Sequence, residues 1–185
     1  MLILGLAARA LDDRVTENFT VEGLTHGRGW WEEDVEGEVA RYHYLCTHVL
    51  EPARVILGCP MIELSGARPL GHNDGGRASS MHLPPIQRAD EKLRFLAPSD
   101  PLKPGFLHEP PERRGAALDF FCRRLPCDEV FRRLDAAQRD GRLPPGGLFW
   151  YAPTPDNPGP ATGRFVHIDF RPTGLARESD KVPPR

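Results

Sequence analysis

Proline and glycine are the residues that most constrain the fold of this chain. Twenty prolines and eighteen glycines together make up about a fifth of its 185 residues. Proline breaks the interior of a helix or a central strand, and glycine weakens both. We therefore expect short regular elements joined by long loops, and we exclude an all-helical bundle and a coiled coil.

The rest of the composition is that of a single packed domain, which we expect over residues 1–185. Hydrophobic residues make up 39% of the chain and charged residues 27%, as in globular proteins. The formal net charge of −2 gives no electrostatic reason to expect nucleic-acid binding. No apolar run reaches the roughly 18 residues of a transmembrane helix. The apolar residues 2–8 lack a preceding basic segment, so we do not expect a signal peptide.

The four cysteines are widely spaced. They include no Cys-x-x-Cys pair, so a cysteine-ligated zinc site is not expected, and buried free thiols are favoured over disulfides. These residues are Cys46, Cys59, Cys122 and Cys127.

Hydrophobic periodicity predicts an α+β fold, with a small, mainly antiparallel sheet and helices packed on one of its sides. Residues 15–33 are expected to form a loop. Residues 83–114, with seven prolines, are interpreted as an insertion loop, and residues 174–185 as a flexible tail. We expect a helix over residues 34–49, which a further turn from Pro52 extends to Gly58, and a second helix capped by Asp128. Strands are expected over residues 61–65, 116–121, 148–152 and 164–170.

Two of these strands carry side chains suited to metal binding. Alternation along 164–170 places His167 and Asp169 on one face, about 7 Å apart, and a solvated surface is the other interpretation of this pair. Asp119 lies in an otherwise apolar strand, where an unpaired buried carboxylate is costly, so we expect it to meet a cation. A carboxylate that caps a turn or pairs with an arginine is the other interpretation. With His82, these residues supply two histidines and one aspartate, a set typical of a catalytic zinc site with a fourth position for water.

The motifs around these residues resemble, in order, those of the zinc peptidases that trim D-alanyl-D-alanine ends and peptide cross-links of bacterial cell walls. That superfamily also contains vancomycin-resistance dipeptidases, phage endolysins and the hedgehog signalling domain. The resemblance covers residues from about Phe19 to Arg171 and implies a hedgehog/D-Ala-D-Ala-peptidase-like fold. The family pattern Ser-x-His-x-x-Gly-x-Ala-x-Asp is matched in two parts, by Ser80-Met81-His82 and by Gly115-Ala116-Ala117-Leu118-Asp119. The family stretch Ser-Gly-Tyr-Arg…Asn…Gly-Gly resembles Ser65-Gly66-Ala67-Arg68, Asn73 and Gly75-Gly76. The family strand Phe-Val-His-x-Asp is matched by Phe165-Val166-His167-Ile168-Asp169.

The aspartate of this pattern has two candidates. The two halves of the pattern are normally two residues apart, whereas residues 83–114 separate them here. Asp90, eight residues after His82, is therefore an alternative to Asp119. We prefer Asp119 because it has the Gly-x-Ala-x-Asp frame and lies in a hydrophobic strand, whereas Asp90 lies in a polar segment.

The resemblance also implies roles for the site residues. Bound Zn²⁺ would acidify a water molecule and polarise an amide carbonyl. Arg68 would hold a substrate carboxylate or stabilise the oxyanion, with a structural salt bridge as its other interpretation. Ser80 and Asn73 would contact the substrate. The implied zinc ligands are His82, Asp119 and His167.

The general base is the position at which this chain departs most from the family. Relatives place a base three or two residues before the last ligand, and these positions are Arg164 and Phe165 here, which cannot accept a proton. Asp169 is therefore the local candidate for a catalytic role, unless it only orients a ligand. A carboxylate of the insertion, Glu109 or Glu112, is a further candidate.

The expected function is that of a zinc-dependent metallopeptidase, a carboxypeptidase or endopeptidase acting on peptidoglycan peptides. A non-catalytic, zinc-stabilised binding module of the same fold and a metal-free phage structural protein are the alternatives. Without a signal peptide, such an enzyme would be made in the cytoplasm and would reach the cell wall after release, as in a phage or prophage. The motifs leave open which peptide bond is cut and the oligomeric state.

Overall fold

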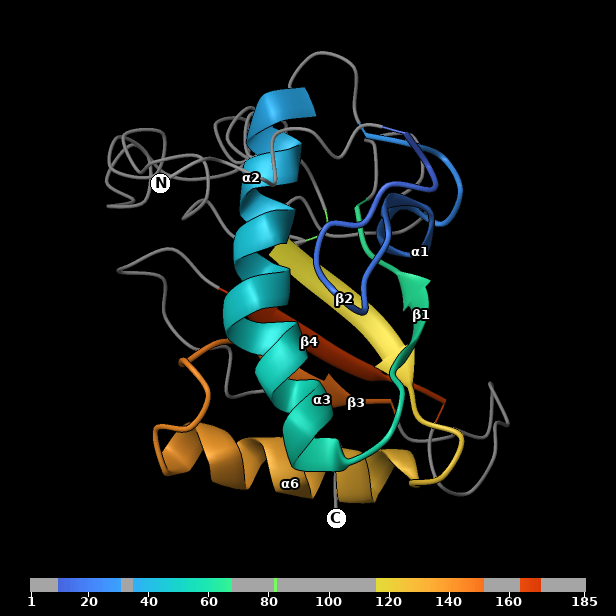
Figure 1. The fold of residues 1–185 in the computed structure, drawn as a ribbon. Helices are drawn as coiled ribbons and strands as arrows, with labels where there is room; N and C mark the ends of the chain where they lie inside the picture. The colour runs from blue at the N-terminus through green and yellow to red at the C-terminus, as the bar shows by residue number, and fades with distance from the viewer. Residues whose placement is uncertain (1–9, 31–34, 68–81, 83–115, 152–163, 171–185) are drawn as a thin grey trace, which may run out of the picture.

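The structure, a computed structural model, describes residues 10–30, 35–67, 82, 116–151 and 164–170. These residues form an α+β fold with a small, open, four-stranded antiparallel sheet (Figure 1). The predicted insertion and the predicted tail lie outside the described residues. The strands are β1 (Ile62–Ser65), β2 (Ala116–Phe121), β3 (Leu148–Trp150) and β4 (Val166–Phe170), in the spatial order β1-β2-β4-β3.

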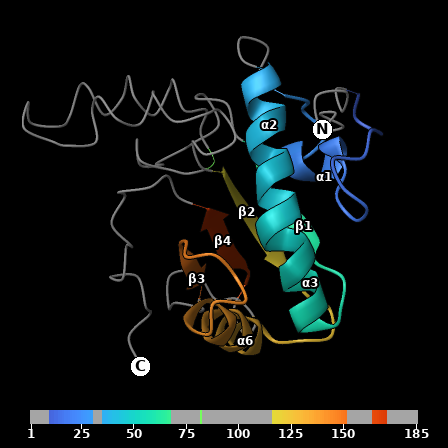
Figure 2. The ribbon, with the colours of Figure 1, turned by 60° about the vertical axis from the view of Figure 1, so that its left-hand side comes forward.

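The helix predicted from residue 34 forms one continuous rod, seen from two directions in Figures 1 and 2. It consists of α2 (Val35–Leu45), the π-helical turn η3 (Cys46–Leu50) and α3 (Glu51–Leu57). The π turn comes just before Pro52, whose nitrogen has no proton to donate to the preceding turn. The rod ends as predicted at Gly58, which adopts a left-handed φ of 66°.

The prediction that residues 15–33 form only a loop was wrong. They contain a one-turn helix, α1 (Val21–Thr25), whose apolar residues are buried. The Thr20 side chain accepts a hydrogen bond from the Gly23 backbone N–H at 3.2 Å. The N-terminal cap and the packing of the apolar residues into the core explain why a helical turn forms here.

The predicted cap of the last helix was also wrong, by two residues. Helix α6 (Cys127–Arg139) has Pro126 at its N-cap position, and Asp128 lies within its first turn. Its negatively charged carboxylate still stabilises the N-terminal end of the helix, because the helix dipole is positive there.

The hydrophobic core lies between the helices and one face of the sheet. Tyr42 of α2 donates a buried hydrogen bond to the Ala117 carbonyl of β2, at 3.1 Å. The four cysteines are buried free thiols, as predicted. None of the described helices has the length and apolar character needed to cross a membrane. The core residues of the two central strands include Leu118, Phe120, Val166 and Ile168.

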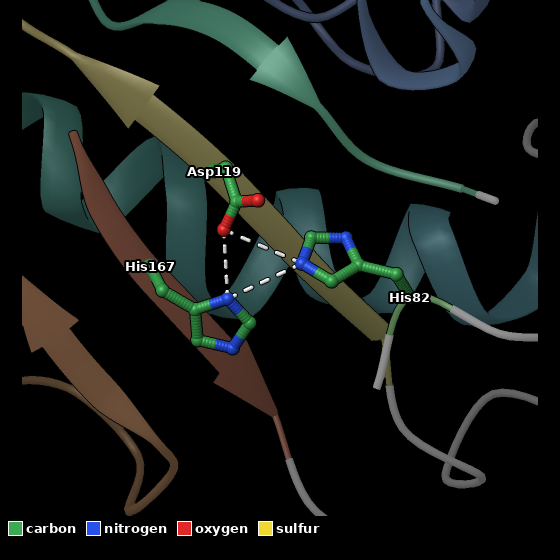
Figure 3. A group of neighbouring side chains, drawn as sticks. All are labelled: His82, Asp119 and His167. Carbon is green, nitrogen blue, oxygen red and sulfur yellow. Dashed lines mark hydrogen bonds and ion pairs between the residues drawn. The ribbon is translucent and has the colours of Figure 1, made fainter. Parts of the chain in front are cut away.

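Asp119 and His167 alternate with these core residues along β2 and β4. They therefore project from the other face of the sheet. In Figure 3 their side chains lie in front of the strands, and the helical ribbon lies behind them.

Candidate metal centre

Asp119 and His167 are direct partners in the register between the two central strands, β2 and β4. Side chains at such positions have Cβ atoms roughly 5 Å apart. Here His167 Nδ1 lies 2.8 Å from Asp119 Oδ1. The sheet register therefore brings an imidazole nitrogen and a carboxylate oxygen close enough to share one ion.

His82 completes this group (Figure 3). Its Nε2 lies 3.2 Å from His167 Nδ1 and 3.3 Å from Asp119 Oδ1. Its other ring nitrogen, Nδ1, lies 2.7 Å from the Gly66 carbonyl oxygen. Because a carbonyl only accepts hydrogen bonds, Nδ1 carries the proton and Nε2 directs its lone pair at the other two side chains.

The Gly66 carbonyl is held in place by close packing against α1. A Cβ atom at position 66 would lie only 2.1 Å from the backbone oxygen of Leu24. The next residue, Ala67, donates its backbone N–H to the same oxygen at 2.8 Å. Only glycine fits at this position, and its fit fixes the carbonyl that orients His82.

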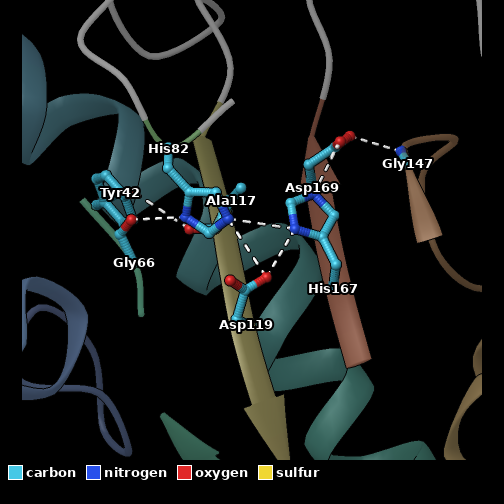
Figure 4. Close-up of polar contacts among 8 residues, drawn as sticks. All are labelled: Tyr42, Gly66, His82, Ala117, Asp119, Gly147, His167 and Asp169. Carbon is cyan, nitrogen blue, oxygen red and sulfur yellow. Dashed lines mark hydrogen bonds and ion pairs between the residues drawn. The ribbon is translucent and has the colours of Figure 1, made fainter. Parts of the chain in front are cut away.

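His167 is oriented in a similar way by Asp169 (Figure 4). Asp169 Oδ2 lies 3.3 Å from His167 Nε2, and its Oδ1 accepts the Gly147 N–H at 2.5 Å. The carboxylate thus favours a proton on Nε2 and leaves Nδ1 to face Asp119 and His82. Phe149, the register partner of His167 on β3, stacks on the imidazole with ring centroids 4.9 Å apart.

Three electron-pair donors therefore meet on one face of the sheet: His82 Nε2, Asp119 Oδ1 and His167 Nδ1. All three side chains are buried, with residue exposures of 3%, 5% and 7%. Among the described residues, this is the one group of three or more histidine, cysteine or acidic side chains that could hold a metal ion. Without a cation or a proton between them, the facing lone pairs would repel one another.

In the structure as it stands, a proton on His167 is favoured between these facing atoms. Burial by itself would lower the pKa of His167, but its contacts with Asp119 and Asp169 outweigh burial and raise this pKa to about 9. Burial would likewise raise the pKa of Asp119, but His82 and His167 hold it well below its ordinary value. A metal ion that bound this group would therefore have to displace the proton of His167.

The interpretation of His167 and Asp169 as a solvated pair is wrong, because every residue of β4 is buried between β2 and β3. Several predicted residues lie outside the described part of the chain. They are Arg68, Asn73 and Ser80, together with the alternatives Asp90, Glu109 and Glu112.

The sequence analysis missed two residues that shape the site. Gly147 holds Asp169, and its signal was the pair of glycines just before the strand predicted from residue 148. Phe149 had no signal of its own, because its contact with His167 depends on the register between β3 and β4.

Comparisons of the chain with protein-family models, with curated protein sequences and with solved structures find no match. The resemblance to cell-wall peptidases therefore stays a prediction from the motif residues. Three of these residues, at positions 82, 119 and 167, form the group that could hold a metal ion.

Proposed function

We propose that this chain is a zinc-dependent peptidase that hydrolyses an amide bond in bacterial cell-wall peptides, as a D-Ala-D-Ala carboxypeptidase or an endopeptidase. The observation that carries the proposal is the meeting of three ligand atoms from three separate motifs. His82, Asp119 and His167 have the residue types and motif positions of the zinc ligands in the peptidases that this sequence resembles. Their convergence also supports Asp119, and not Asp90, as the aspartate of the pattern.

Zinc is the proposed ion because of the donor set. Two imidazole nitrogens and one carboxylate oxygen suit Zn²⁺, whereas Ca²⁺ and Mg²⁺ prefer oxygen ligands. Both imidazoles direct a ring nitrogen at the site while the other nitrogen is held by the protein. When bound in such a site, zinc lowers the pKa of a water ligand and polarises a substrate carbonyl.

The residues proposed to bind substrate come from the motifs. Arg68 is proposed to pair with the terminal carboxylate of a peptide or with the developing oxyanion. Ser80 and Asn73 are proposed to contact the peptide beside it. A terminal carboxylate next to the cleaved bond is what a D-Ala-D-Ala carboxypeptidase must recognise.

One observation favours a second candidate, a zinc-stabilised binding module without turnover. Asp169, the local candidate for a base, directs one oxygen at His167 and the other at the Gly147 N–H. It is only 1% exposed. A carboxylate held in this way is better placed to orient His167 than to take a proton from water. Under the peptidase proposal, the base is then a residue outside the described part of the chain, such as Glu109 or Glu112.

The first experiment is metal analysis of the purified wild type beside three variants, Asp119→Ala, Asp90→Ala and Asp140→Ala. Asp140 is an exposed residue at the end of α6 and serves as the matched control. We expect one zinc per chain in every protein except Asp119→Ala. Loss of zinc in Asp90→Ala alone would place the ligand in the insertion. A wild type that takes up no metal when zinc is supplied would leave a metal-free structural protein as the better description.

The second experiment measures turnover. The zinc-loaded wild type is incubated with a stem pentapeptide that ends in D-Ala-D-Ala and with a cross-linked muropeptide dimer, and the products are identified by mass spectrometry. Release of the terminal D-alanine indicates a carboxypeptidase, and separation of the dimer an endopeptidase. A protein that binds zinc but leaves both substrates intact would be the binding module.

A further inference from the structure

We propose that Asp169 and the turn of Gly146 and Gly147 form a clamp that selects Nδ1 of His167 as its metal-binding nitrogen. Asp169 is thus a positioning residue, which acts on the ion through His167 without touching it. This inference rests on the metal site of the proposed function and goes beyond it, because it assigns the ligand atom and the residues that choose it.

The Asp169 carboxylate is held in one orientation by its contacts. The two oxygens of Asp169 serve different partners: Oδ1 accepts the Gly147 N–H at 2.5 Å, and Oδ2 faces His167 Nε2 at 3.3 Å (Figure 4). A backbone N–H cannot give up its proton, so the first contact fixes the carboxylate. The second oxygen then lies where it accepts a hydrogen bond from a protonated Nε2.

The turn of Gly146 and Gly147 holds the backbone of this aspartate as well. The Asp169 backbone N–H donates to the Gly147 carbonyl at 2.9 Å. A Cβ atom at position 146 would lie 2.0 Å from the backbone oxygen of Asp169. The two glycines therefore approach the backbone and the carboxylate of Asp169 together, at a distance that a larger residue at position 146 would prevent.

These contacts determine which ring nitrogen of His167 carries the proton. A neutral imidazole carries one proton, and a proton on Nε2 leaves the lone pair on Nδ1. Nδ1 is the atom that faces Asp119 Oδ1 at 2.8 Å and His82 Nε2 at 3.2 Å. Stacking on Phe149 further restricts rotation of the ring. A proton on Nδ1 would instead block the site.

The test is the variant Asp169→Asn, which keeps the shape of the side chain but has a single acceptor oxygen. If that oxygen accepts the Gly147 N–H, the amide nitrogen faces His167 Nε2 as a donor and favours a proton on Nδ1. We expect the affinity for Zn²⁺, measured by competition with a chelator, to fall by roughly 10- to 100-fold. Asp140→Asn is the control and should bind Zn²⁺ like the wild type.

A spectroscopic readout separates this role from a general loss of structure. In ¹⁵N NMR spectra of the zinc-loaded wild type, we expect His167 Nε2 to carry a proton and Nδ1 to bind the metal. This measurement needs no variant, so it holds even if Asp169→Asn folds poorly. Zinc on Nε2 of His167, or a folded Asp169→Asn protein with wild-type affinity for Zn²⁺, would overturn the inference. Failure of the peptide assays with zinc still bound would overturn only the proposed peptidase activity.

Discussion

Asp119 and His167 lie directly opposite each other on β2 and β4, and their side-chain atoms Oδ1 and Nδ1 are 2.8 Å apart. They are 48 residues apart in the sequence. A shift of one residue in this register would turn one of them into the core and separate the pair. The candidate metal centre therefore depends on the pairing of the two central strands as much as on the residue types.

Gly66→Ala tests how strictly the chain after β1 is positioned. The added Cβ would lie 2.1 Å from the Leu24 backbone oxygen, so the segment that carries the Gly66 carbonyl must move. We expect a loss of about 1–3 kcal/mol in the free energy of unfolding and weaker zinc binding, since His82 loses its orienting contact. Urea unfolding and chelator competition measure the two effects.

Gly23→Ala is the matched control for this substitution. Its Cβ would meet the end of the Glu63 side chain, which can rotate away, and alanine is favoured over glycine within a helix. We expect little change in stability or in zinc binding. Equal effects of the two variants would contradict a specific role for Gly66.

The stability of the metal-free protein should depend on pH through the central pair. The pKa of His167 is raised from 6.5 to about 9 in the folded protein, so its stabilising contribution is full below about pH 6.5 and is lost as the pH rises through 9. The lowered pKa of Asp119 stabilises the fold above its ordinary value of 3.8, and this contribution is lost as the pH falls below that value. Urea unfolding with a chelator present, from pH 4 to 9, should show stability declining above about pH 6.5.

Zinc binding should show the opposite dependence on pH above neutrality. The ion competes with the proton of His167, so the affinity should rise between pH 6 and 9, and binding near pH 7 should release about one proton. Calorimetry in buffers with different ionisation enthalpies measures this release. An affinity that does not change with pH would show that His167 is not a ligand.

Tyr42→Phe tests the link between the helical rod and the strand that carries Asp119. The variant removes the buried hydrogen bond from the tyrosine hydroxyl to the Ala117 carbonyl. We expect a loss of about 1 kcal/mol in the free energy of unfolding. Tyr44→Phe is the control, because the ring of Tyr44 would keep its tilted contact with the ring of Phe170, and this variant should lose less stability.

The cysteines should react slowly with thiol reagents in the folded protein. All four are buried, and burial raises the pKa of the thiols of Cys46, Cys122 and Cys127, that of Cys122 to about 12. We expect little alkylation at pH 8 and modification of all four after unfolding in urea. Rapid modification of Cys122 in the native state would contradict its position in the core.

The sequence by itself determined the elements that have strong local signals. The steps of three and four between apolar residues from Val35 to Val49 identified the long helix, and Gly58 marked its end. The alternating and apolar runs identified the four strands. The apolar strand around Asp119 and the alternation around His167 indicated two candidate ligands, and the motif resemblance added His82.

Only the tertiary structure decided how these residues meet. The spatial order β1-β2-β4-β3 makes Asp119 and His167 neighbours, and no pattern within either strand specifies which strand pairs with it. The roles of Gly66, Gly147 and Phe149 likewise come from close approaches between distant segments. Periodicity records which face of an element is buried, whereas the contacts that orient a ring nitrogen depend on distances between elements, and these distances exist only in the folded chain.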